Sequence, residues 1–205
     1  MNKEEAIQQT VEVLRRGGVI LYPTDTIWGI GCDARNADAV ERLYAIKERD
    51  HAKSMLVLIR SEVRSRKSEA DLQPPTSDLQ PPTSDLRPPT SPRPTTYILP
   101  RERWQPLLGD CVAANLPAAD GTLGIRVPDH GFCQEVMRRL GAPLVSTSAN
   151  LSGRPSPRTY NEIEEELRRR VDYCVPPLPE FESHETRGSR IVKIDSDGRE
   201  TVIRP

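Results

Sequence analysis

Residues 19–29 read VILYPTDTIWG, an apolar run that passes directly into a short polar loop. The run 19–22 predicts a buried strand, which Pro23 ends. The loop that follows places two threonine hydroxyls and one carboxylate at the tip of this strand. Because open α/β sheets usually bind ligands at the carboxyl ends of their strands, these residues form a candidate binding loop. Taken alone, such residues more often form a turn that only caps the next element.

Apolar periodicity on both sides of this stretch predicts a sheet covered by helices. Helical spacing of apolar residues predicts helices at 4–16, 37–47, 133–140 and 159–170. Short apolar runs predict further strands at 55–59, 97–99, 123–127, 144–146, 191–194 and 201–203. This mixed order of strands and helices indicates an α/β or α+β fold.

Length and charge exclude several classes of protein. The 205 residues are enough for one domain, or one domain with an appendage. A net charge of −1, from 29 basic and 30 acidic residues, excludes a polycation that binds nucleic acid through bulk charge. No apolar run approaches the ~18 residues of a membrane span, and no apolar segment follows the first Met. We therefore expect a cytoplasmic protein without a membrane partner.

The thiols and imidazoles show no metal-site spacing. No C-x-x-C pair occurs, so we expect reduced, mostly buried thiols at Cys32, Cys111, Cys133 and Cys174. The three histidines are scattered and are expected at the surface, at His51, His130 and His184. No metal site is predicted.

Residues 61–92 interrupt the pattern with the repeat DLQPPT, SDLQPPT, SDLRPPT, and eight of the 20 prolines fall between residues 70 and 94. The period is seven, but the Pro-Pro pairs exclude a coiled coil. We expect a disordered Pro-rich insertion within a single domain of residues 1–205. A ligand for an aromatic groove and a duplication without function both fit this composition.

Three other segments carry candidate binding groups. At the end of a predicted helix, Lys47 and Arg49 suit a polyphosphate, although helix-dipole compensation explains them more simply. Arg126 lies inside an apolar strand and needs a carboxylate, either a structural one such as Asp25 or that of a substrate. Residues 144–153, LVSTSANLSG, join a strand to a hydroxyl-rich turn. This turn could approach a phosphate closely, or it could be an ordinary Ser/Thr turn without a ligand.

The motifs LYPTDTIWGIGCDA, YAIKERD, KSMLVLI, TLGIRVP, STSANLSGRPSP, SRIVKI and the terminal IRP together resemble the YrdC family, in family order. That family includes the single-domain threonylcarbamoyladenylate synthases. The resemblance covers the chain except about residues 61–92, and it implies an α/β fold with a twisted mixed sheet covered by helices.

The resemblance implies a nucleotidyltransferase that joins L-threonine, bicarbonate and ATP into threonylcarbamoyl-AMP and releases pyrophosphate. The product serves the threonylcarbamoyl modification of adenosine 37 in tRNA, so a downstream tRNA threonylcarbamoyltransferase complex is the implied partner. Weak RNA binding is compatible with this role. Mg²⁺ is expected with ATP, held chiefly by phosphates and water, and no tightly bound organic cofactor is expected.

The resemblance also implies site residues. Threonine would be held by Thr26, Arg126, Ser146 and Ser189. The nucleotide would be held by Lys47, Arg49, Lys53, Thr122, Ser148, Asn150, Ser156 and Arg204. A threonine carboxylate then explains Arg126 better than a structural pair does. No residue is assigned as a nucleophile, because such a condensation needs positioning and charge stabilisation.

Two departures from the family keep other functions open. The repeat replaces a region that is mostly helical in the family, and Ser189-Arg190-Ile191-Val192 replaces the usual Ser-Thr-Ile-Val. A non-catalytic RNA-binding module would use Lys47, Arg49, Lys53 and Arg126 to grip phosphates, but only nine aromatic residues are present for base stacking. A degraded, inactive homologue is the third hypothesis.

Overall fold

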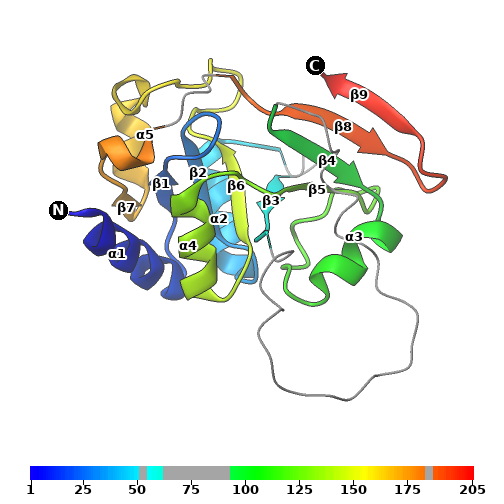
Figure 1. Ribbon diagram of the computed structural model, residues 1–205, viewed down its shortest axis with the longest axis horizontal. Helices are drawn as coiled ribbons and strands as arrows, with labels where there is room; N and C mark the ends of the chain where they lie inside the picture. The colour runs from blue at the N-terminus through cyan, green and yellow to red at the C-terminus, as the bar shows by residue number, and fades with distance from the viewer. Residues whose placement is uncertain (51–54, 62–92, 183–186) are drawn as a thin grey trace, which may run out of the picture.

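Strand pairing organises the computed structural model, which describes residues 1–50, 55–61, 93–182 and 187–205. Nine strands in these residues form one mixed sheet in the order β7-β1-β2-β6-β3-β5-β4-β8-β9 (Figure 1). Their bounds are β1 Ile20–Tyr22, β2 Gly29–Asp33, β3 Leu56–Leu58, β4 Thr95–Leu99, β5 Leu123–Arg126, β6 Leu144–Ser148, β7 Tyr173–Cys174, β8 Arg190–Ile194 and β9 Glu200–Arg204. Parallel pairs join β1 to β7, β3 to β5 and β4 to β8, and the other pairs are antiparallel. The expected α/β class is confirmed.

Helices cover both faces of this sheet. Their bounds are α1 Lys3–Arg15, α2 Ala37–Lys47, α3 Arg101–Leu108, α4 Gly131–Leu140 and α5 Glu165–Arg170. Helices α1 and α4 lie against each other and share one apolar cluster with Ile20 and Tyr22. Helices α2, α3 and α5 belong to a second cluster, which includes Leu21 of the same strand. The alternation within β1 shows how one strand supplies both cores.

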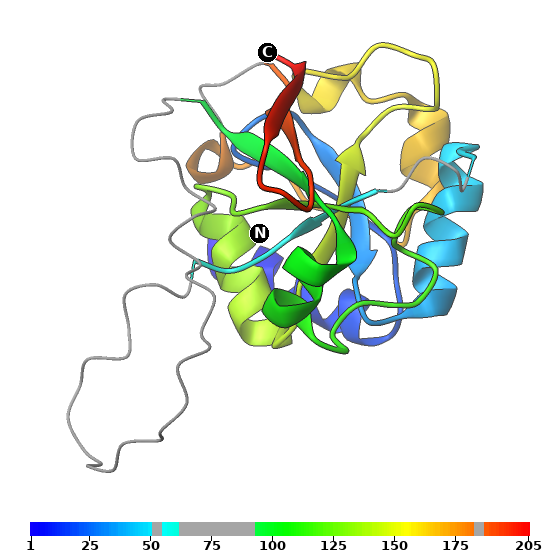
Figure 2. The ribbon, with the colours of Figure 1, turned by 90° about the vertical axis from the view of Figure 1, so that its right-hand side faces the viewer.

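The hairpin β8–β9 lies beside β4 at one end of the sheet (Figure 2). Strand β9 pairs with β8 alone, and its five residues are exposed. Its Val202 and Ile203, with Met1, are the large apolar side chains exposed in the described part of the chain. No helix among the described residues has the length and apolar content needed to cross a membrane.

Most predicted elements are confirmed, but β2, β7 and α3 were not predicted, and one predicted helix is divided. Strand β2 was not predicted, because its sequence GIGCD lacks an apolar run; Gly31 is needed there, since a Cβ would lie 1.9 Å from the carbonyl oxygen of Val145. Helix α3 was not predicted and contains Pro106. The helix expected at 159–170 is divided into a 3-10 turn, Tyr160–Glu162, and α5, with the buried Ile163 extended between them.

Some predicted features lie outside the described residues or differ from expectation. The repeat, His51, Lys53 and His184 lie outside the described residues. His130 is not at the surface: it is half-buried, and its Nε2 lies 3.1 Å from the carbonyl oxygen of Phe181. Burial lowers the pKa of His130. The four cysteines are unpaired; Cys32 and Cys133 are buried, Cys174 is half-buried and Cys111 is exposed.

Candidate functional site

A cavity of about 350 Å³ opens on the face of the sheet that also carries α1 and α4. Alternate residues along a strand share a face, so Leu58 of β3 faces the helical cluster while Leu56 lines the cavity. In the same way, Leu144 of β6 is in the cluster and Ser146 is in the cavity. The helices therefore stop short of the site and leave this part of the sheet as its floor.

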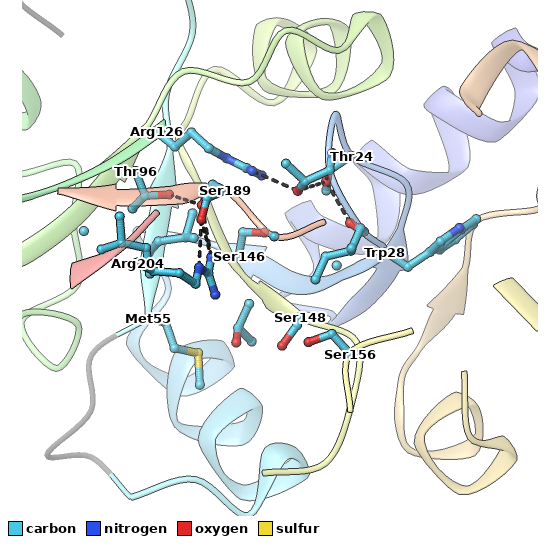
Figure 3. A pocket seen from close by; sticks show the side chains of 18 of the residues that line it. Thr24, Trp28, Met55, Thr96, Arg126, Ser146, Ser148, Ser156, Ser189 and Arg204 are labelled. Carbon is cyan, nitrogen blue, oxygen red and sulfur yellow. Dashed lines mark hydrogen bonds between the residues drawn. The ribbon is translucent and has the colours of Figure 1, made fainter. Parts of the chain in front are cut away.

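The lining is rich in hydroxyls and positive charge. Eight residues that carry hydroxyls line the cavity: Thr24, Thr26, Thr96, Ser146, Thr147, Ser148, Ser156 and Ser189. Three arginines also line it, Arg49, Arg126 and Arg204, and no carboxylate does so among the described residues. Figure 3 shows Arg126 and Thr24 on one side and Ser148 and Ser156 on the other. Such a lining suits an anionic ligand with hydrogen-bonding groups along its length.

The loop between β1 and β2 holds the buried end of Arg126. Its Nη1 donates to Thr26 Oγ1 at 2.9 Å, and its Nη2 lies 3.3 Å from Asp25 Oδ1. Thr24 Oγ1 lies 3.0 Å from Thr26 Oγ1 and donates to the carbonyl oxygen of Ile27. Arg126 Nε is buried without a hydrogen-bond partner. The structural carboxylate that the sequence offered as one alternative is thus present beside Arg126, and one buried donor has no partner.

A second set of contacts fixes the opposite edge of the sheet. Ser189 Oγ lies 2.7 Å from Thr96 Oγ1, and both side chains are buried. Arg204 Nε and Nη2 donate to the carbonyl oxygen of Ser189 at 2.9 and 2.6 Å. A Cβ on Gly188 would lie 2.9 Å from Arg204 Nη2, so glycine there lets the guanidinium approach. Partial burial and the charges of Arg126 and Arg93 lower the pKa of Arg204.

The structure brings together most of the predicted site residues. The four residues predicted to bind threonine all line the cavity: Thr26, Arg126, Ser146 and Ser189. Four of the residues predicted to bind the nucleotide also line it: Arg49, Ser148, Ser156 and Arg204.

Three other residues that were predicted to bind the nucleotide have partners within the protein and do not line the cavity. Lys47 is buried, with its Nζ on the carbonyl oxygens of Ser148 and Asn150. Asn150 Nδ2 donates to the carbonyl oxygens of Leu151 and Arg154. Thr122 Oγ1 donates to Asp120 Oδ1 at 2.6 Å.

Other lining residues were missed by the sequence analysis. Thr24 lies in the candidate loop, but only Thr26 of this loop was predicted as a site residue. Thr96 could not be found, because it reaches the cavity through the long-range pairing of β4 with β5 and β8. Trp28 also lines the cavity, and its ring makes an edge contact with Tyr160 at a centroid distance of 5.1 Å.

Burial also affects the two cations at the end of α2. Burial and the charge of Arg49 lower the pKa of Lys47 to about 7. Burial likewise lowers the pKa of Arg49. Among the described residues, no three His, Cys, Asp or Glu side chains are grouped as metal ligands.

Known proteins share the sequence and the fold of this chain. The Sua5/YciO/YrdC family model, described as "Telomere recombination", matches residues 12–205. The threonylcarbamoyl-AMP synthase of Pseudomonas fluorescens is 37% identical over 166 residues, which are 81% of this chain and 82% of that protein. The crystal structure of E. coli YciO is 26% identical, with a TM-score of 0.69 over 100% of this chain and 90% of its own. P. abyssi Sua5 complexed with L-threonine shares the fold (TM-score 0.73, 21% identity), and this chain, matched over 100% of its length, covers 55% of that one.

Proposed function

The chain belongs to the Sua5/YciO/YrdC family, and from this premise we infer that it is an enzyme, a threonylcarbamoyl-AMP synthase. Its substrates are L-threonine, bicarbonate and ATP, and its products are threonylcarbamoyl-AMP and pyrophosphate. The observation that carries this proposal is the cavity that joins three arginines to eight hydroxyls. An amino acid and a nucleotide both present anionic groups and hydrogen-bonding groups to such a lining.

The cavity suits two different substrates. We assign threonine to Thr26, Arg126, Ser146 and Ser189. The guanidinium of Arg126 and the nearby hydroxyls supply donors for its carboxylate. We assign the nucleotide to Arg49, Ser148, Ser156 and Arg204. These assignments place the threonine amine and the nucleotide phosphates in one cavity.

The chemistry needs no nucleophile from the protein. The threonine amine and bicarbonate give an N-carboxylate with loss of water, and an oxygen of that carboxylate attacks the α-phosphorus of ATP. The bond from this phosphorus to the β-phosphate oxygen breaks, and pyrophosphate leaves with the electron pair. Arg49 and Arg204 would stabilise the charge that develops on the phosphates, and the cavity would hold the two reactants in line.

Mg²⁺ would enter with ATP as part of the substrate, because this ion is usually bound through phosphates and water. A tRNA threonylcarbamoyltransferase complex would consume the product, and we propose the cytoplasm as the site of the reaction. These are proposals about partners, and they follow from the product's chemistry: an acyl adenylate carries an activated carbonyl that an acceptor amine can attack.

Mass detection of the adenylate tests the function. The protein is incubated with ATP, Mg²⁺, threonine and bicarbonate, and parallel reactions omit one substrate each. A product with the mass of threonylcarbamoyl-AMP that needs all three substrates is the expected result. Absence of this product, together with RNA binding that weakens steeply with salt, would instead identify a non-catalytic RNA-binding module.

A further inference from the structure

Lys47, the last residue of α2, connects two parts of the chain that are a hundred residues apart. Its side chain is 1% exposed. Nζ donates to the carbonyl oxygen of Ser148 at 2.5 Å and to that of Asn150. The carbonyl oxygen of Lys47 itself accepts from the amide and the hydroxyl of Ser152, at 3.2 and 2.9 Å. The helix end and the turn 148–152 are therefore joined in both directions through one residue.

The backbone at Glu48 separates the roles of the two cations beside it. Glu48 has φ 50° and ψ 43°, and it is the non-glycine residue with positive φ in the described part of the chain. Because this left-handed residue ends α2, Lys47 points into the protein while Arg49 lines the cavity. The exposed Glu48 carboxylate pairs with Arg170 at 2.9 Å.

Two carbonyl oxygens that converge need a donor between them, since their dipoles repel and each loses water on burial. An ammonium has three N–H donors and a neutral amine has two, so Lys47 can satisfy both carbonyls in either protonation state. With these carbonyls turned inward, the Ser148 side chain lines the cavity. Asn150 Nδ2 continues the turn toward Ser156 through its bond to the carbonyl oxygen of Arg154.

We propose that Lys47 is a positioning residue: it shapes the turn 148–152 so that Ser148 and Ser156 face the nucleotide, and it does not touch the nucleotide itself. The proposal rests on the proposed function for the identity of the ligand. It differs from a role as a direct phosphate ligand, because the two carbonyl contacts already direct Nζ away from the cavity lining.

The test compares Lys47→Met with Lys3→Met, a control that removes an exposed lysine. For Lys47→Met we expect the KM for ATP to rise about tenfold or more, because one buried hydrogen-bonded contact is lost. Threonine binding should change less than about twofold, because three of its four assigned residues, Thr26, Arg126 and Ser189, lie outside β6 and the turn that follows it. Amide exchange of residues 148–152 should become faster in the ligand-free protein. Lys3→Met should match the unsubstituted protein in all three measurements.

A double substitution separates positioning from direct contact. If Lys47 acts through the turn, Lys47→Met with Ser148→Ala raises the KM for ATP little more than the worse single substitution does. Additive effects with unchanged exchange in the ligand-free protein would show direct contact and overturn the proposal. A loss of stability with an unchanged KM per folded molecule would show a purely structural role and also overturn it.

Two further measurements keep the result interpretable. If Lys47→Met does not fold, Lys47→Gln retains an NH₂ donor and should show the same changes at smaller size; an unchanged KM and unchanged exchange in this variant would overturn the proposal. If the unsubstituted protein makes no threonylcarbamoyl-AMP, the proposed function fails. The exchange of residues 148–152 and the binding of ATP alone then still test Lys47.

Discussion

Arg126 and Asp25 form a buried ion pair behind the cavity, with Nη2 of the arginine 3.3 Å from Oδ1 of the aspartate. The other carboxylate oxygen accepts from the amide of Asp129 at 3.1 Å. Asp25 does not line the cavity, whereas Arg126 does. The aspartate therefore holds the arginine in place from behind, while the buried Nε–H has no hydrogen-bond partner.

Removing Asp25 should damage both the fold and the site. For Asp25→Ala we expect a loss of about 3–5 kcal/mol in the free energy of unfolding, because a buried charge loses its partner. Asp25→Asn keeps the shape and should lose less stability, while the KM for threonine still rises. Urea unfolding and threonine-dependent rates measure the two effects. Full stability in Asp25→Ala would mean that the pair does not stabilise the fold.

Removing Arg126 should weaken threonine selectively. Arg126→Met should raise the KM for threonine by a factor that corresponds to about 2–5 kcal/mol, the usual cost of truncating a buried charged contact. Arg138→Met is the matched control, since Arg138 is 57% exposed and pairs with Glu135 on the surface of α4. An unchanged threonine KM in folded Arg126→Met would remove this residue from the threonine site.

A methyl group at residue 188 should disturb Arg204 without disturbing the core. In Gly188→Ala the new Cβ would meet Arg204 Nη2 at 2.9 Å, and the flexible side chain would have to leave the Ser189 carbonyl. We expect the KM for ATP to rise about tenfold, as for the loss of one hydrogen bond to a charged group.

Gly131→Ala is the matched control for this substitution, because its Cβ would meet no atom within 4 Å. Gly131 also opens α4, where alanine favours the helix. Kinetics for ATP and thermal unfolding of both variants separate the site from the scaffold. Equal ATP kinetics in the two variants would show that the contact of Arg204 with Ser189 is not used.

Stability should depend on pH through Lys47. Burial lowers the pKa of Lys47 in the folded protein to about 7, against an ordinary lysine value of 10.5. Between these values the unfolded chain binds more protons than the folded one, so this group adds stability as the pH rises from 7 toward 10.5. The slope is at most about 1.4 kcal/mol per pH unit.

The difference in unfolding free energy between the unsubstituted protein and Lys47→Met isolates this group. It should be flat below pH 7 and should increase above it. Urea unfolding at a series of pH values measures the difference. In the same series, Lys3→Met should show no such pH-dependent difference from the unsubstituted protein. A difference that stays constant from pH 7 to 10 would mean that Lys47 keeps its ordinary pKa.

Much of the scaffold was predictable because its signals are local. Helix α2 has the predicted bounds, and α1 differs by one residue at each end, since apolar spacing, the Asn36 cap and the terminal glycines act within a few residues. Strand β2 and helix α3 were missed because their local sequence signals oppose the structure that they adopt. Gly31 and Pro106 are unfavourable locally, and long-range packing keeps their segments in a strand and a helix.

The sequence alone indicated many of the side chains that line the site, because the polar loop after β1 and the hydroxyl-rich end of β6 interrupt otherwise apolar strands. Only the tertiary structure decided what each of them does. Whether Arg126 has a protein carboxylate depends on the approach of Asp25, which is about a hundred residues away in the chain. Whether Lys47 or Arg49 faces the cavity depends on one left-handed residue between them and on two carbonyl oxygens from β6 and the turn after it. A side chain's direction is set by the partners that satisfy its charge on burial, and those partners come from distant segments that no local pattern records.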